Sequence, residues 1–255
     1  MRKCYLFVGF LIALLFSQIP AAAAGKSPAE INALYYNLNQ TKLQSFKCQV
    51  ATDAFDQIKE RVYASLNEDE QRELDNFQFY LTYENGNLIF DSSAYPRFEN
   101  ENTTQGMKKV LDGIGLMLNG TFTSWKGVIA EPLIAVDEKY RITENKNGYT
   151  VTYKQAGNNV ELTLNQDYLL EKASFRMDNQ TMVVVPEFIP TKEGLLIAKI
   201  DLNIGDGIIR EVITVNYQDI QGIHLPAEIN LQMNMGQVSQ ELTIKCFDYQ
   251  VAVGP

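Results

Sequence analysis

The sequence predicts an α+β fold in which a curled antiparallel β-sheet, an incomplete barrel, carries helices packed on its concave side. Three observations lead to this prediction. Beyond Pro132, apolar residues alternate with polar ones in segment after segment, which is the period of half-buried strands. Turn dipeptides such as Asn147-Gly148 and Gln221-Gly222 separate these segments, and connections this short join antiparallel neighbours. Before Pro132, apolar residues recur mostly at helical spacing.

The first half opens with a helix start. Ser27, Pro28 and Glu30 suit the N-cap, N1 and N3 positions of a capping box, and we expect a helix from there to about residue 40. A strand over 43–52 follows. Residues 53–76 have helical spacing again, and Asn67 with Glu70 forms a second capping-box pattern.

A hairpin and a glycine-containing helix complete the first half. Asn85-Gly86 favours a type I′ turn between two short strands, 77–83 and 88–91. Residues 103–119 then read as a helix that contains Gly113 and Gly115, each of which costs about 1 kcal/mol relative to alanine. Either the helix is closely packed there or it is able to shift, and we favour close packing.

The second half predicts a meander of antiparallel strands, with Pro226 expected to disturb the pairing locally. An open sheet of this size tends to curl because strands twist. The helices at 27–40 and 103–119 are the natural filling for its concave side. The predicted strands are 138–145, 148–155, 159–165, 168–177, 181–189, 195–204, 208–219, 223–235 and 238–251.

The N-terminus has the pattern of a secretory signal peptide. Arg2 and Lys3 precede an apolar run over 5–16 and four alanines that end at Ala24. We expect cleavage near Ala24 and a periplasmic or secreted location in a bacterium. The domain prediction is a signal peptide over 1–24 and a single domain over 25–255, with a helix-rich part, 25–131, and the antiparallel meander, 132–255.

Charge excludes some partners. Without Arg2 and Lys3, 20 basic residues stand against 31 acidic ones, a net charge near −11. Such a chain repels nucleic-acid phosphates and is unsuited to electrostatic docking on anionic lipid. We expect no transmembrane segment in the mature chain, since no later stretch is long and apolar enough.

Two cysteines, Cys48 and Cys246, remain after removal of the signal peptide. An even pair in an oxidising compartment predicts a disulfide. It would link the first strand to the last and contribute about 2–4 kcal/mol. The alternative is two buried free thiols.

The sequence favours a non-catalytic protein without cofactor or metal. The only histidine is His224, and no nucleophile motif or phosphate-binding loop is present. A pairing of Cys48 with His224 is a weak alternative. Asp201, Asp206 and Glu211 could supply a carboxylate pair, but Asp206-Gly207 is more typical of a hairpin turn.

The chain resembles the LolA/LolB-like periplasmic lipoprotein carriers. The resemblance rests on the helix-to-strand segment LYYNLNQTKLQSFKCQV after the signal peptide, on the meander, and on ITVNYQDIQGIHLPAEINLQ at 213–232. That last segment is close to the pattern V-x-Y-x-x-x-x-G-x-x-L-P-x-x-I. The resemblance implies an unclosed barrel that holds acyl chains or other hydrophobic ligands. The helical segment 53–76 departs from that layout, as does the long stretch 103–131.

The predicted function is therefore a carrier or sensor of a hydrophobic ligand, lipid or lipoprotein, in the cell envelope. The alternative is an interaction module with a solid core and an acidic surface, whose partner would be a basic or membrane-anchored protein. A concave apolar surface is the usual small-molecule site, and its predicted residues form a helical cover and a strand wall. The cover is Met107, Leu111, Ile114 and Leu118, and the wall is Tyr149, Val151, Tyr153, Leu162, Leu164, Ile229, Leu231 and Met233.

Overall fold

The computed structural model describes residues 26–134, 139–155, 158–177, 180–205 and 207–254. The predicted signal peptide and its cleavage site lie outside these residues. Within them, no helix combines the length and the apolar character needed to cross a membrane.

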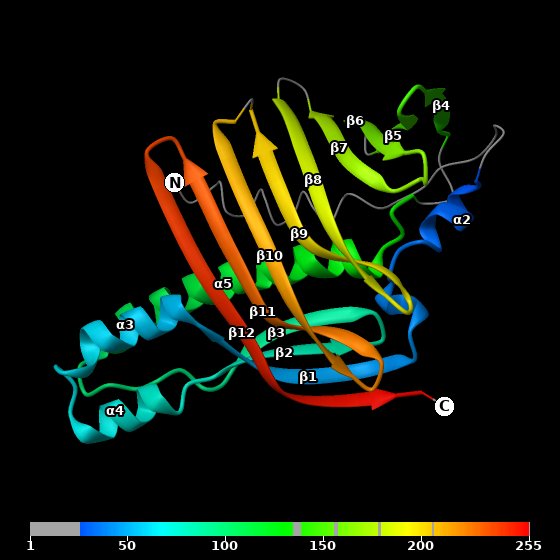
Figure 1. The fold of residues 1–255 in the computed structure, drawn as a ribbon. Coiled ribbons are helices and arrows are strands. Elements are labelled where there is room, and N and C mark those ends of the chain that lie inside the picture. The colour runs from blue at the N-terminus through cyan, green and yellow to red at the C-terminus, as the bar shows by residue number, and fades with distance from the viewer. Residues whose placement is uncertain (1–25, 135–138, 156–157, 178–179, 206, 255) are drawn as a thin grey trace.

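In the described part of the chain, twelve antiparallel strands form one sheet that is not closed into a barrel (Figure 1). The first half contributes β1 (Leu43–Thr52), β2 (Phe79–Glu84) and β3 (Asn87–Ser92). The second half contributes β4 (Arg141–Asn145), β5 (Gly148–Gln155), β6 (Asn158–Asn165), β7 (Leu170–Met177), β8 (Gln180–Thr191), β9 (Gly194–Ile204), β10 (Ile209–Ile220), β11 (Ile223–Met235) and β12 (Val238–Val253). The strand order is β3-β2-β1-β12-β11-β10-β9-β8-β7-β6-β5-β4, so the predicted α+β class and antiparallel sheet agree with the structure.

The two halves of the chain share this sheet. β1 pairs antiparallel with β12, for example Phe46 with Val251, and also with β2. The helix-rich part therefore supplies three strands to the end of the meander, and β3 and β4 are left as the two edges.

Local turn chemistry sets the hairpins. Asn85 (φ 51°) and Gly86 (φ 78°) both adopt positive φ, as do Gln221 (φ 58°) and Gly222 (φ 82°). Two positive φ angles in succession are what a type I′ turn requires, so the predicted turns are confirmed. The expected disturbance near Pro226 is also confirmed, since the register with β10 shifts where Pro226 faces Tyr217.

The N-terminal helix is much shorter than predicted. α2 (Pro28–Asn32) begins with the expected capping box, in which the Ser27 N–H donates to the Glu30 carboxylate over 2.7 Å. The chain then leaves the helix because residues 34–36 pair in parallel with the start of β9: the Tyr36 N–H donates to the Leu195 carbonyl over 2.9 Å. A single 3₁₀ turn, η1 (Leu38–Gln40), follows.

This pairing brings two backbones into close contact at Gly194. A Cβ at Gly194 would lie 2.9 Å from the Tyr35 carbonyl carbon, and its φ of +127° is one that other residues rarely adopt. Glycine is therefore required here, and a tertiary contact overrides the local helix signal.

The segment 53–76 forms two helices, α3 (Asp53–Tyr63) and α4 (Glu68–Asp75). The second capping box explains the division, because the Asn67 side chain accepts the N–H groups of Asp69 and Glu70 and starts a new helix. Both helices lie at the same end of the molecule (Figure 1).

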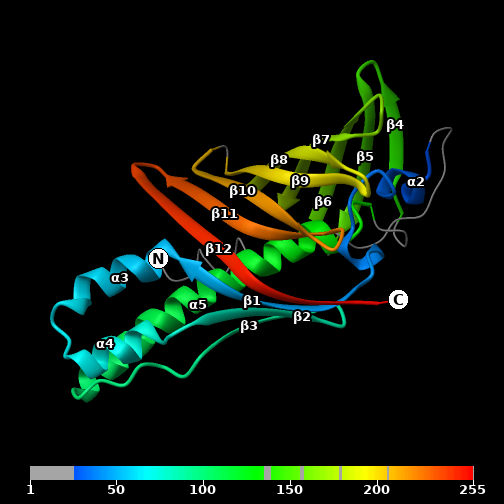
Figure 2. The same cartoon turned by 60° about the horizontal axis from the view of Figure 1, so that its bottom comes forward.

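The longest helix, α5 (Glu101–Ala130), extends well beyond the predicted end at residue 119. It continues because Phe122, Trp125 and Ile129 carry its buried stripe onward. α5 packs against β3 and β9, and Figure 2 shows it running between β1–β3 and the strands β8–β10. Its apolar side and the inward strand residues form the core.

Candidate ligand cavity

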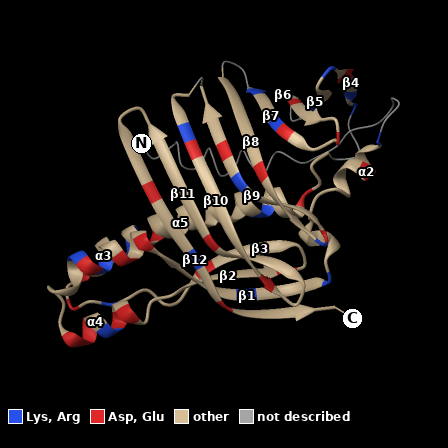
Figure 3. Ribbon diagram, viewed as in Figure 1, with Lys and Arg blue, Asp and Glu red and all other residues tan. Residues whose placement is uncertain are grey.

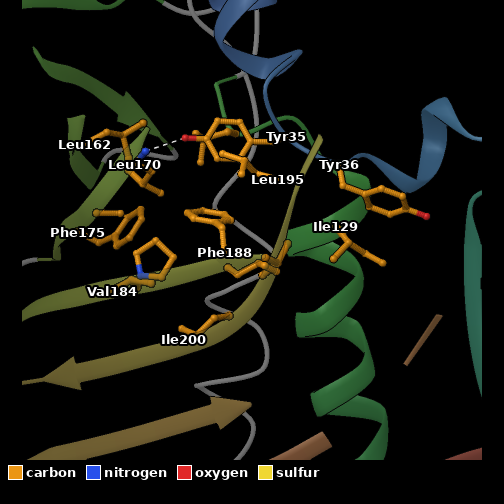
Figure 4. Close-up of a pocket in the computed structure, with 15 residues that line it drawn as sticks. Tyr35, Tyr36, Ile129, Leu162, Leu170, Phe175, Val184, Phe188, Leu195 and Ile200 are labelled. Carbon is orange, nitrogen blue, oxygen red and sulfur yellow. Dashed lines mark hydrogen bonds between the residues drawn. The ribbon is translucent and has the colours of Figure 1, made fainter. Parts of the chain in front are cut away.

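A small apolar cavity lies between the C-terminal end of α5 and the inward face of β6–β9 (Figure 4). Its volume is about 60 Å³. Val128 and Ile129 of α5, Leu133, and the tyrosines of the segment 34–36 close it from one side. The strand side chains that complete the lining are Leu162, Leu170, Ala173, Phe175, Val184, Pro186, Phe188, Leu195, Ile197 and Ile200.

The two polar groups at the cavity, the hydroxyls of Tyr35 and Tyr36, are engaged by backbone. The Tyr35 hydroxyl accepts the Leu170 N–H over 2.7 Å, and it donates to the Tyr168 carbonyl over 3.4 Å. The Tyr36 hydroxyl accepts the His224 N–H over 3.2 Å. Burial raises the pKa of each tyrosine to about 12, so both stay neutral and the cavity offers an apolar wall rather than acid–base groups.

A second, smaller cavity continues the first beneath α5. Its volume is about 20 Å³, and it shares Val128, Ile197 and Ile200 with the larger one. On the helix side it is lined by Thr121 and Ser124. Their hydroxyls donate to the carbonyls four residues earlier, over 3.1 and 3.0 Å, so they present no free donor to the cavity.

The glycines of α5 are not explained by close packing alone. A Cβ at Gly113 or Gly120 would have no neighbour within 4 Å, whereas one at Gly115 would touch the rings of Phe90 and Phe79 at 3.7 and 3.9 Å. Contacts of 3.7 and 3.9 Å are ordinary van der Waals distances, so a Cβ would fit at Gly115 as well, and close packing requires glycine at neither Gly113 nor Gly115. Each of these glycines weakens the helix by about 1 kcal/mol relative to alanine.

The structure separates the predicted cover from the predicted wall. Met107, Leu111, Ile114 and Leu118 are all buried, but they lie on the part of α5 that precedes the cavities and line neither of them. Of the wall residues, Leu162 lines the larger cavity and Ile229 the smaller one. Val151, Tyr153 and Leu164 are buried elsewhere in the core, and Tyr149, Leu231 and Met233 are half-buried.

Sequence reasoning missed most of the cavity lining. Phe175 and Val184 alternate with exposed residues on β7 and β8, so their inward direction could have been found from the pattern. Tyr35 and Leu195 could not, because they reach the cavity through a pairing between distant segments.

The two cysteines are buried on the adjacent strands β1 and β12 and are free in the structure. The hydrogen bond to Cys48 and burial hold the pKa of the Cys246 thiol well above its usual range. The disulfide between them stays a prediction. His224 does not join them, since its Nε2 lies 3.3 Å from Glu193 Oε2.

One carboxyl group, that of Glu211 on β10, is buried on the same face of the strand as the core residues Ile213 and Val215. Its side chain is 3% exposed, and its Oε2 has no hydrogen-bond partner among the described residues. Burial raises its pKa to about 7. The considered pairing with Asp201 is wrong, because Glu211 opposes Leu202 while Asp201 opposes Val212, so the two carboxylates point to opposite faces of the sheet.

Within the described ranges, no group of three or more His, Cys, Asp or Glu residues is placed to hold a metal ion. Comparison with known proteins gives no relative: no family model, no curated protein and no solved structure matches the chain.

Proposed function

We propose that this protein is a non-catalytic carrier or sensor that holds an apolar ligand between α5 and the inward face of β6–β11. The observation that carries the proposal is a pair of adjoining cavities with apolar walls whose tyrosine and helix hydroxyls are already engaged. Lining of this kind suits hydrocarbon, because the hydroxyl groups at the cavities already have hydrogen-bond partners. The buried Trp125 Nε1 at the smaller cavity has no such partner among the described residues. In this proposal the sheet acts as an incomplete barrel with α5 on its concave side.

The cavities must widen to take such a ligand. A cavity of about 150 Å³ holds one benzene molecule, and the larger cavity here measures about 60 Å³. In this proposal the structure is therefore the closed state. Displacement of the C-terminal part of α5 would merge the two cavities, since Val128 forms part of both. The unpacked Gly113 and Gly120 make α5 the element best suited to move.

The proposed setting is the cell envelope. It follows from the signal-peptide pattern, which predicts export, and it accords with the resemblance to LolA/LolB-like carriers. The proposed ligand is a lipid, a lipoprotein acyl chain or another hydrophobic small molecule.

Two neighbouring valines provide the test. Val184 is buried and lines the larger cavity, while Val185 is 40% exposed on the other face of β8. Val184→Phe should fill the cavity and weaken uptake of a fluorescent fatty acid at least tenfold. Val185→Phe, the matched control, should bind as the unmodified protein does.

Thermal unfolding of both variants checks that they fold. If Val184→Phe unfolds, Ala173→Val adds less volume to the same cavity and replaces it. Equal fatty-acid binding by the cavity variant and the control, or no binding by the unmodified protein, would overturn the proposal.

The second candidate function is an interaction module with a solid core. The observation in its favour is the small volume of the cavities, together with the acidic helix α4, which carries Glu68, Asp69 and Glu70 in its first turn. This candidate predicts salt-sensitive binding to a basic protein and no uptake of fatty acid.

A further inference from the structure

A third and much larger hollow lies on the opposite face of the same strands. It is an open groove of about 950 Å³ across β5–β8. We call it the basic groove, because Lys139, Lys154, Lys172 and Arg176 line it. Arg176 and Lys172 alternate along β7 with Ala173 and Phe175, which line the apolar cavity, so the groove and the cavity are on opposite faces of the sheet. The groove is independent of the proposed cavity function.

The cations of the basic groove are not neutralised by salt bridges, unlike several cations elsewhere among the described residues. Lys59, Lys199 and Arg210 each lie within 2.6 Å of a carboxylate oxygen. By contrast, no described carboxylate forms a salt bridge with any of the four groove cations, although the chain has a net charge of −9. Figure 3 shows β7 with its two basic positions. Unpaired positive charges gathered in a hollow of a negatively charged protein indicate an anionic ligand.

The strand register gives the spacing of the residues that carry these charges. Lys154 faces Asn159 on β6, and Asn159 faces Arg176 on β7, so the Cα positions of Lys154 and Arg176 are separated by two strand spacings, about 10 Å. Lys172 precedes Arg176 by four residues on β7, which is about 13 Å along the strand. A ligand with anionic groups about 10–13 Å apart would meet two cations at once.

One carboxylate, Glu161, lies within the same groove. It faces Thr152 on β5 and Ser174 on β7. A carboxylate only accepts hydrogen bonds, so it repels a bare polyanion but binds hydroxyl groups. The combination of outer cations and one carboxylate suits a molecule that has both anionic groups and hydroxyls.

We propose that the basic groove binds a small phosphorylated sugar or polyol with at least two phosphate groups. The phosphates contact the lysines and Arg176, and ligand hydroxyls donate to Glu161. A groove of this volume is typical of small-molecule sites. A membrane or a nucleic acid is disfavoured, because a large anionic surface would also meet the negative charge of the rest of the protein.

Fructose 1,6-bisphosphate is the probe, and calorimetry measures its binding to the full protein. The double substitution Lys172→Gln and Arg176→Gln should weaken binding at least tenfold. Arg210→Gln removes a cation that is paired with Asp201 outside the groove, so it should leave the affinity unchanged. Thermal unfolding confirms that each variant folds.

Glu161→Gln separates a sugar phosphate from a simple anion. It should strengthen the binding of inorganic tripolyphosphate more than the binding of the bisphosphate. Both ligands gain from the loss of a negative charge in the groove, but only the sugar also loses a strong acceptor for its hydroxyls. The proposal is overturned if the bisphosphate does not bind or if the double variant binds it equally well. Tighter binding of phosphatidylglycerol vesicles or polyglutamate would also overturn it, by assigning the groove to a membrane or an acidic protein.

Discussion

The buried carboxyl group of Glu211 should make the protein less stable as the pH rises from acid to neutral. In the folded protein burial raises its pKa from 4.5 to about 7. Between these two values the unfolded chain has released the proton while the folded protein still holds it, so unfolding is favoured as the pH increases. At about 1.4 kcal/mol per pKa unit, the loss of unfolding free energy caused by Glu211 reaches about 3 kcal/mol above pH 7 and vanishes below pH 4.5.

Glu211→Gln removes this cost while keeping the shape of the side chain. Urea unfolding should show that the variant is more stable than the unmodified protein by about 3 kcal/mol at pH 8 and by much less at pH 4.5. Glu241→Gln, at an exposed position on β12, is the control and should show no such pH-dependent difference. A constant difference between Glu211→Gln and the unmodified protein from pH 4.5 to 8 would refute the reasoning.

Three further predictions follow from the packing of α5, of the segment 34–36 and of the cavity. Gly120→Ala should stabilise the protein by about 1 kcal/mol, because the new Cβ meets nothing within 4 Å; a lowered melting temperature would contradict this. Gly194→Ala should destabilise it by more than 1 kcal/mol and speed amide exchange at Tyr36 and Leu195, because its Cβ would lie 2.9 Å from backbone atoms; unchanged exchange at these two amides would count against the pairing. Leu162→Ala should lower the free energy of unfolding by about 2–5 kcal/mol and enlarge the cavity. Benzene should therefore raise the melting temperature of this variant more than that of Leu164→Ala, because Leu164 lies outside the cavity. Equal shifts of the two melting temperatures would place the cavity elsewhere.

The strands of the second half could be predicted closely from the sequence because their signals are local. The predicted ranges 148–155 and 223–235 match β5 and β11 to the residue. Alternation defines the strand, and a turn pair such as Gln221-Gly222 defines where it begins.

The helices were harder to predict from the sequence, because tertiary contacts decide where each helix ends. The signal for α5 weakens at Gly120, where glycine and the threonines beyond it lower helix propensity. Burial of Phe122 and Trp125 carries the helix past this point. At the N-terminus the opposite occurs, since pairing with Leu195 ends α2 despite apolar residues at helical spacing.

The cavity could be predicted only in part for the same reason. Inward alternation correctly identifies buried positions such as Leu162 and Ile229. Which of the buried positions border a cavity depends on where α5 crosses the sheet and on how residues 34–36 pair, and neither is encoded in a local pattern. The predicted cover residues were therefore placed on the correct helix and the correct face but too far toward its N-terminus.

Native mass spectrometry of the protein purified from its own host tests the central claim most directly. The account predicts that part of the protein carries a co-purified hydrophobic molecule, which is lost on delipidation and is absent from Val184→Phe. Protein that is always free of such a molecule and does not take up added fatty acid after delipidation would contradict it.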